Sequence, residues 1–177
     1  MKLNLKKKNK GFNLIELMIS LAIMSILIGA AAPSFAMWMA NLRVRSVAEG
    51  LNLGILQARS EAIRKNQLIK FNVNLGTTGW QILDESGSVL NSKNAKEGST
   101  GVNITSSSGG NVITFNGLGG VVGNVDGTPS VQTLSVNSPQ AANLTQTLNV
   151  VVGSGGATLV CDPTVTLTTD VKYCRTL

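Results

Sequence analysis

The segment KKKNKGFNLIELMISLAIM, residues 6–24, joins a basic stretch to an apolar one through a single glycine, Gly11. The apolar part begins at Phe12 and continues to about residue 32. This is roughly 30 Å of helix at about 1.5 Å per residue, enough to cross the hydrocarbon core of a bilayer. The segment therefore predicts a membrane-spanning helix, which we place at residues 12–34.

A single carboxylate, Glu16, lies inside this apolar run, five residues after Gly11. A charge in the middle of a membrane span costs roughly 2.5–3.5 kcal/mol on insertion scales, and such a charge usually meets a partner of opposite sign. Glu16 is therefore the first functional candidate of the chain. The alternative is a protonated or snorkelling side chain without a partner.

Five lysines precede the apolar run: Lys2, Lys6, Lys7, Lys8 and Lys10. By the positive-inside rule they hold the N-terminus in the cytoplasm, so the rest of the chain lies across the membrane. A cleaved secretory signal peptide is the alternative, with the three alanines at 30–32 as its cleavage site. Two features argue against it, because a carboxylate is unfavourable in a signal-peptide core and because the helical pattern continues past the span.

The stretch KGFNLIELMISLAIMSILIGAAAPSF, residues 10–35, resembles the N-terminal signal of type IV pilins and type II secretion pseudopilins. The resemblance implies that a prepilin peptidase removes a cytoplasmic leader, residues 1–11, by cutting between Gly11 and Phe12. It also implies that the new amino terminus at Phe12 is methylated. Glu16 would then approach the Phe12 amine of a neighbouring subunit and set the axial register of a growing filament.

The charge of the chain is unevenly distributed. The 177 residues carry a net charge of +6, and the isoelectric point is near 9.6. Five of the fifteen cations lie in the leader, so ten remain against nine carboxylates once it is removed. The basic character therefore reports membrane topology and is poor evidence for nucleic-acid binding.

Two cysteines, Cys161 and Cys174, are expected to form one disulfide in an oxidising compartment, with two free thiols as the alternative. The absence of histidine excludes a Ser-His-Asp triad and argues against a zinc site. The fragment Asn124-Val-Asp126-Gly127 is interpreted as a turn, because a calcium site needs about 6–8 oxygen ligands. We therefore expect no enzyme, no cofactor and no metal.

The helical pattern continues beyond the span, to about residue 66. Apolar residues recur there at spacings of three and four, which predicts a stripe that packs on a sheet: Val44, Val47, Leu51, Ile55, Ala58 and Ala62. Arg45–Glu49 and Glu61–Lys65 are expected as ion pairs one helical turn apart. Pro33 cannot donate a hydrogen bond to the carbonyl of Gly29, so a kink is predicted between these two residues.

From residue 67 the apolar period changes from about 3.6 to 2, which indicates β-strands. Nine strands separated by glycine-rich turns are predicted: Gln67–Asn74, Trp80–Asp84, Ser88–Asn91, Val102–Thr105, Asn111–Phe115, Val131–Val136, Gln146–Val152, Ala157–Cys161 and Val165–Thr168. The chain is thus predicted to be α+β, with a long helix over 12–66 packed on a small antiparallel β-sandwich over 67–177, the pilin-like fold.

Two further stretches, LNLGILQARSEAIRKNQLIKFNV (51–73) and ITFNGLGGV (113–121), resemble the GspH/FimT/FimU-like class of minor pilins and pseudopilins. The resemblance implies a minor pilin that initiates or caps type IV pilus assembly together with other minor and major pilins. Such a protein is held in the bacterial inner membrane with its C-terminal domain in the periplasm, and then lies at the filament tip. The alternatives are pseudopilin H of type II secretion and a DNA-binding minor pilin for natural transformation, with Lys172, Tyr173 and Arg175 as the DNA contacts.

Overall fold

The computed structural model describes residues 11–95, 100–138, 146–175 and 177. The chain divides into two compact units, Met1–Ala36 and Met37–Leu177. The five lysines of the predicted leader lie outside the described residues.

A single long helix, α1, runs from Leu14 to Lys65. Asn13, a residue type favoured at helix N-caps, precedes it. Asn66, the residue that follows the helix, adopts a left-handed conformation with φ of 49°, as residues that terminate helices often do. Pro33 lies inside α1 with helical structure on both sides of it, and the kink between Gly29 and Pro33 stays a prediction.

The first unit contributes the apolar half of α1. All side chains from residue 11 to residue 36 are exposed, including many large apolar ones. By length and composition α1 is able to cross a membrane, and among the described residues it is the one helix that meets this test. An apolar helix that is exposed all round is unfavourable in water and requires a lipid or protein environment.

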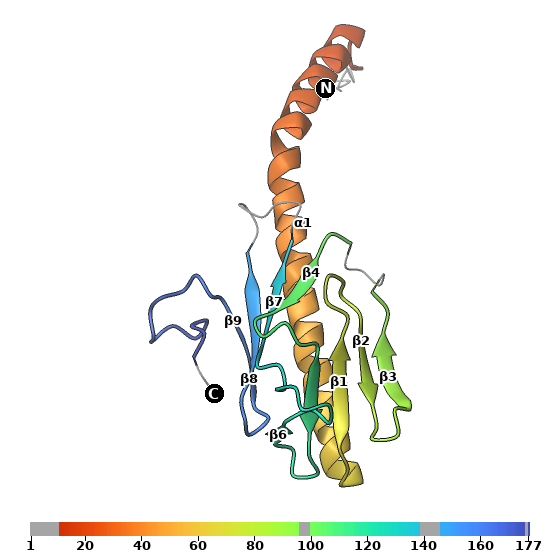
Figure 1. The fold of residues 1–177 in the computed structure, drawn as a ribbon. Coiled ribbons are helices and arrows are strands. Elements are labelled where there is room, and N and C mark those ends of the chain that lie inside the picture. Colours follow the sequence, from red (N-terminus) through yellow and green to blue (C-terminus); the bar gives the residue numbers. More distant parts are fainter. Residues whose placement is uncertain (1–10, 96–99, 139–145, 176) are drawn as a thin grey trace, which may run out of the picture. The chain divides into compact units, whose positions relative to one another are not determined.

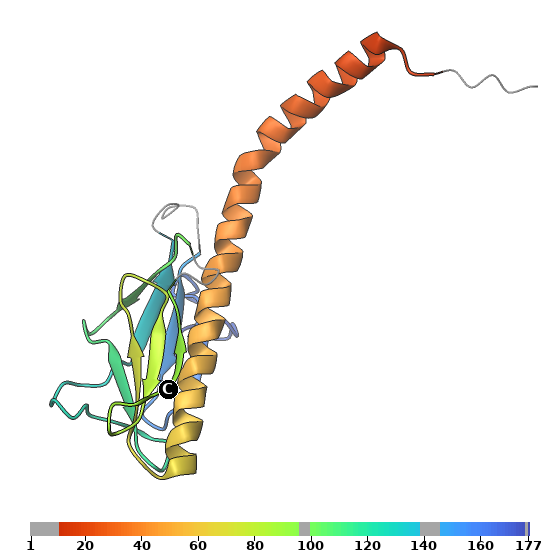
Figure 2. The same ribbon diagram turned by 90° about the vertical axis from the view of Figure 1, so that its right-hand side faces the viewer.

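The second unit contains two antiparallel sheets beside the C-terminal half of α1 (Figures 1 and 2). The five-stranded sheet has the order β3-β2-β1-β5-β6, with bounds Ile69–Val73 (β1), Trp80–Leu83 (β2), Val89–Lys93 (β3), Val112–Phe115 (β5) and Val121–Val122 (β6). The four-stranded sheet has the order β4-β7-β8-β9, with bounds Asn103–Ser106 (β4), Thr133–Asn137 (β7), Leu148–Val152 (β8) and Thr158–Cys161 (β9). Both sheets lie on the same side of the helix (Figure 2), and their edge strands β3 and β9 lie on opposite flanks (Figure 1).

The core of this unit forms where the helix meets the sheets. The six residues of the predicted helical stripe are all buried, which confirms that part of the prediction. They pack with alternate residues of the strands, for example Ile69, Phe71 and Val73 of β1. Phe71 and Trp80 form an aromatic pair with ring centroids 5.4 Å apart. The α+β class, with one long helix on antiparallel sheets, is thus confirmed.

The local predictions need three corrections. Eight predicted strands are present with ends shifted by up to two residues, but Val165–Thr168 is not a strand, because turns that begin at Asp162 redirect the chain there. The two-residue strand β6 was not predicted. Glu61 pairs with Arg64 at 2.5 Å, three residues away, instead of with Lys65.

Candidate functional site

The predicted processing residues, Gly11 and Phe12, precede α1 and are not helical. Phe12 is 87% exposed. A Cβ atom at Gly11 would meet no heavy atom within 4 Å, so packing does not explain the glycine. The peptide between the two residues is therefore accessible, as a cleavage site must be.

Glu16 lies in the first turn of α1 and is exposed. Its backbone carbonyl accepts a hydrogen bond of 2.7 Å from Ser20 Oγ. The ion pairs found among the described residues do not include its carboxylate. The neighbouring side chains Ile15 and Ile19 are apolar and more than half exposed, so a single acid stands on an otherwise apolar surface.

A second group of predicted residues lies at the other end of the chain. Cys161 and Cys174 form the predicted disulfide, with their Cα atoms 5.0 Å apart. The bond joins the end of β9 to the C-terminal segment, drawn in dark blue in Figure 1. Asp162 and Tyr173 form an isolated parallel bridge next to it, in which the Asp162 N–H donates to the Lys172 carbonyl at 2.8 Å.

Asp162 is the polar centre of this region, and the sequence analysis missed it. Asp162 is 7% exposed, and its carboxylate accepts hydrogen bonds from Gln146 Nε2 at 2.6 Å and from Thr164 Oγ1 at 2.6 Å. Burial acts to raise the pKa of Asp162, but these hydrogen bonds outweigh it and lower the pKa below its ordinary value. The Asp-Pro-Thr sequence that follows Cys161 is the available signal, because aspartate often accepts a backbone N–H two residues ahead in a turn.

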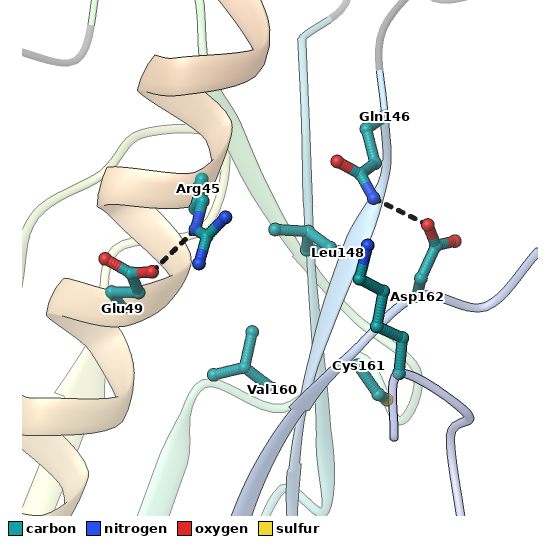
Figure 3. A pocket seen from close by; sticks show the side chains of 8 residues that line it. Arg45, Glu49, Gln146, Leu148, Val160, Cys161 and Asp162 are labelled. Carbon is teal, nitrogen blue, oxygen red and sulfur yellow. Dashed lines mark hydrogen bonds and ion pairs between the residues drawn. The ribbon is translucent and has the colours of Figure 1, made fainter. Parts of the chain in front are cut away.

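A groove of about 190 Å³ runs between α1 and the edge of the four-stranded sheet (Figure 3). Leu148 and Val160 supply apolar lining, and the remaining lining residues are Arg45, Glu49, Gln146, Cys161, Asp162 and Lys172. Arg45 Nε and Glu49 Oε1 are 2.8 Å apart, which confirms the predicted ion pair. Figure 3 shows this pair on the helix side and the Gln146–Asp162 hydrogen bond on the strand side.

The three predicted DNA contacts have different surroundings in the C-terminal segment, and their role in DNA binding stays a prediction. Lys172 lines the groove and lies close enough to Asp162 to help lower its pKa. Tyr173 is half-buried at the bridge, whereas Arg175 is exposed. The backbone N–H of Lys172 donates to Asp170 Oδ1 at 2.8 Å, so carboxylates accompany these cations.

The turn between β5 and β6 contains another set of residues whose role was not predicted. The Gly119 carbonyl accepts a hydrogen bond of 3.1 Å from Arg59 Nε on α1. Gly119 has φ of 79°, and a Cβ atom there would lie 2.7 Å from Ile63 Cδ1. The positive φ of Gly119 thus favours glycine at this position, where the turn lies close to the helix. Among the described residues, no group of three metal-ligating acids, cysteines or histidines is found.

Comparisons with known proteins give consistent findings. The family model described as "Type II transport protein GspH" matches residues 47–156, and the model described as "Prokaryotic N-terminal methylation motif" matches residues 6–32. The minor pilin FimU of Pseudomonas aeruginosa is 20% identical with a TM-score of 0.51, covering 66% of this chain and 87% of that one. The minor pseudopilin EpsH of Vibrio cholerae is 15% identical with a TM-score of 0.51, covering 70% and 99%. The search of curated proteins finds no match.

Proposed function

Because this chain belongs to the type II transport protein GspH family of pilin and pseudopilin subunits, we propose that it is a minor pilin that helps to initiate or cap the assembly of a type IV pilus. It acts by binding other minor and major pilins and carries out no catalysis. A pseudopilin of a type II secretion system is the second candidate, and the description of the matching family favours it.

The observation that carries the proposal is the single carboxylate at the start of an exposed apolar helix. In the proposed mechanism a prepilin peptidase cuts between Gly11 and Phe12 and methylates the freed amine, which remains cationic. Glu16 of one subunit then neutralises the Phe12 amine of the next. Burial in the membrane or in a bundle of helices strengthens this pairing, because an unpaired charge is costly there.

The same helix fixes the location of the subunit in this proposal. Residues 12–34 hold the chain in the inner membrane as a single-pass protein before assembly, with the leader in the cytoplasm and the β domain in the periplasm. The motif match over residues 6–32 supports the anchor. After extraction the apolar helices lie side by side inside the filament, most simply near its tip for a minor subunit.

The test is Glu16→Ala in the full chain, with Ser20→Ala as the matched control. Ser20 lies one turn further along the same exposed helix, and within the described part of the chain its hydroxyl donates to the Glu16 backbone carbonyl. We expect the membrane level of both variants to equal that of the wild type. In sheared filaments we expect Glu16→Ala to fall by at least about tenfold, which corresponds to about 1.4 kcal/mol, and Ser20→Ala to be unchanged. Incorporation of Glu16→Ala into filaments at the wild-type level would contradict the proposal.

The choice between the two candidates rests on which filament retains the wild-type chain. Recovery with pili sheared from the cell surface supports the type IV pilus. Recovery only with the periplasmic pseudopilus, together with a loss of protein export when the chain is deleted, assigns it to type II secretion.

A further inference from the structure

The outer edge of β9 carries backbone groups that have no partner among the described residues. β9 is the last strand of the four-stranded sheet, where it pairs with β8. The N–H of Gly153 donates to the Ala157 carbonyl at 2.9 Å, so these two residues form a hydrogen-bonded pair where β8 and β9 meet. Because bonded and non-bonded pairs alternate in an antiparallel ladder, the backbone groups of Thr158 and Val160 point away from β8.

This edge already accepts backbone at one end. Asp162, the next outward-facing residue, donates its N–H to the Lys172 carbonyl at 2.8 Å. The N–H and C=O groups of Thr158 and Val160 meet no comparable partner in the described ranges of the chain. Among the described residues, two consecutive outward positions therefore have no backbone partner, and the disulfide-bonded segment closes the end of the edge beyond them.

The opposite edge strand, β3, is protected in a way that β9 is not. The outward N–H of Ser92 is accepted by the side chain of Asn91 at 2.8 Å. The pairing of β2 with β3 shifts register between Ile82 and Leu83, and β3 ends in the cation Lys93. Side-chain capping, irregular register and charge are the means by which edge strands avoid pairing with other chains. The β9 sequence, Thr-Leu-Val-Cys, has no charge, and its register with β8 is regular.

The groove next to this edge indicates which partner would fit. Its volume of about 190 Å³ is below the roughly 300–1,000 Å³ of small-molecule sites. Arg45 and Glu49 form an ion pair, and the carboxylate of Asp162 accepts hydrogen bonds from Gln146 and Thr164. These charged groups already have partners and do not favour a charged ligand. An extended backbone that carries a small apolar side chain opposite Val160 complements both the hydrogen-bonding edge and the groove.

We propose that the outer edge of β9 at Thr158 and Val160 accepts an extended strand from a neighbouring subunit of the filament. In this mode main-chain hydrogen bonds supply affinity, and the groove selects the side chain that enters it. The proposal rests on the proposed function for the identity of the partner. It adds a contact between β domains to the one between the apolar helices.

The experiment places Val160→Pro and Thr158→Lys separately in the full chain. Val160→Pro removes an outward N–H, the position at which an edge strand tolerates proline. Thr158→Lys introduces the kind of charge that protects natural edges. Ser92→Lys is the matched control, because Ser92 also has an outward backbone on an edge strand. Oxidised Cys161–Cys174 and an unchanged melting temperature show that each variant is folded.

We expect both β9 variants to be retained in sheared filaments at less than about one third of the wild-type level, with Ser92→Lys unchanged. Hydrogen exchange gives an independent measurement. The Val160 amide should exchange quickly in the detergent-solubilised chain and at least tenfold more slowly in filaments, whereas the Leu159 amide, bonded to β8, should be slow in both.

Retention of both β9 variants at the wild-type level, or fast exchange of Val160 in filaments, would overturn the strand addition while leaving the proposed function intact. Cross-linking of β9 to β9 between two copies would also overturn it, since the partner would then be the chain itself. Absence of the wild-type chain from filaments would overturn both proposals.

Discussion

At the scale of single residues, two glycines on one face of α1 have different surroundings. A Cβ atom at Gly54 would lie 2.9 Å from Phe71 Cε2 and 3.0 Å from Trp80 Cε2, inside the aromatic pair of the core. A Cβ atom at Gly50, one turn earlier, would meet only Lys93 Nζ, at 3.1 Å. Nζ is the end of a flexible side chain and can move aside. Gly54 is therefore required by packing, and Gly50 is not.

We predict opposite effects of alanine at the two positions. Alanine is better than glycine in a helix interior by about 1 kcal/mol. Gly50→Ala should therefore raise the free energy of unfolding by up to that amount. Gly54→Ala gains the same helix propensity but overpacks the core, which typically costs about 1–3 kcal/mol. Its free energy of unfolding should therefore be lower than that of Gly50→Ala by this overpacking cost. Chemical denaturation of both variants in detergent measures it, and equal stabilities would contradict the close helix–sheet contact.

At the scale of elements, the helix and most strands were predictable because their periods differ and glycine-rich turns separate them. The predicted strand Val165–Thr168 was wrong because turns override its sequence pattern. Its alternation of apolar residues and threonines is typical of a strand, but Asp162 and the disulfide hold the chain in turns there. β6 was missed because its pairing depends on a distant hydroxyl, Ser130 Oγ, which accepts from the Thr114 N–H at 3.1 Å and donates to the Val122 carbonyl.

The ionised carboxylate of Asp162 holds the C-terminal segment by its hydrogen bonds, so the stability of the domain should depend on pH. The pKa of Asp162 is lowered in the folded chain, so its contribution to stability is complete above the ordinary aspartate pKa of about 3.9 and is lost as pH falls through the lower folded value. At neutral pH, Asp162→Asn should lower the free energy of unfolding by about 1.5–3 kcal/mol, the range for hydrogen bonds to charged groups.

Thermal unfolding of the full chain between pH 7 and pH 2 measures this effect. The difference between wild type and Asp162→Asn should shrink as the pH falls below about 3.9. Asp170→Asn is the control, because Asp170 belongs to the same segment but is exposed. A difference that stays constant over the whole range would show that the ionised form is not the stabilising one.

At the scale of the whole molecule, the sequence indicated separate roles for its two ends, and the structure adds the groove between α1 and β9. The N-terminal motif that contains Gly11, Phe12 and Glu16 could be recognised because it is local and continuous, and the match over residues 6–32 supports it. The roles of the three residues stay predictions. The groove could not, because its helix side and its strand side come from residues about 100 or more positions apart that meet only in the folded chain. The same distinction applies to one partner of Asp162, since Gln146 is supplied by another segment, whereas its other partner, Thr164, is local.

The last prediction concerns the mature chain. If the five lysines before Gly11 serve only to set topology and to present the cleavage site, the assembled protein should lack them. Mass spectrometry of the protein from filaments should find Phe12 as the first residue, with one methyl group on its amine. Replacing Gly11 by a bulky residue should leave the leader attached, keep the chain in the membrane and abolish its incorporation. A protein that instead begins at or after Pro33 would have lost Glu16 with its apolar helix, and pairing of Glu16 with a neighbouring amine would then be impossible.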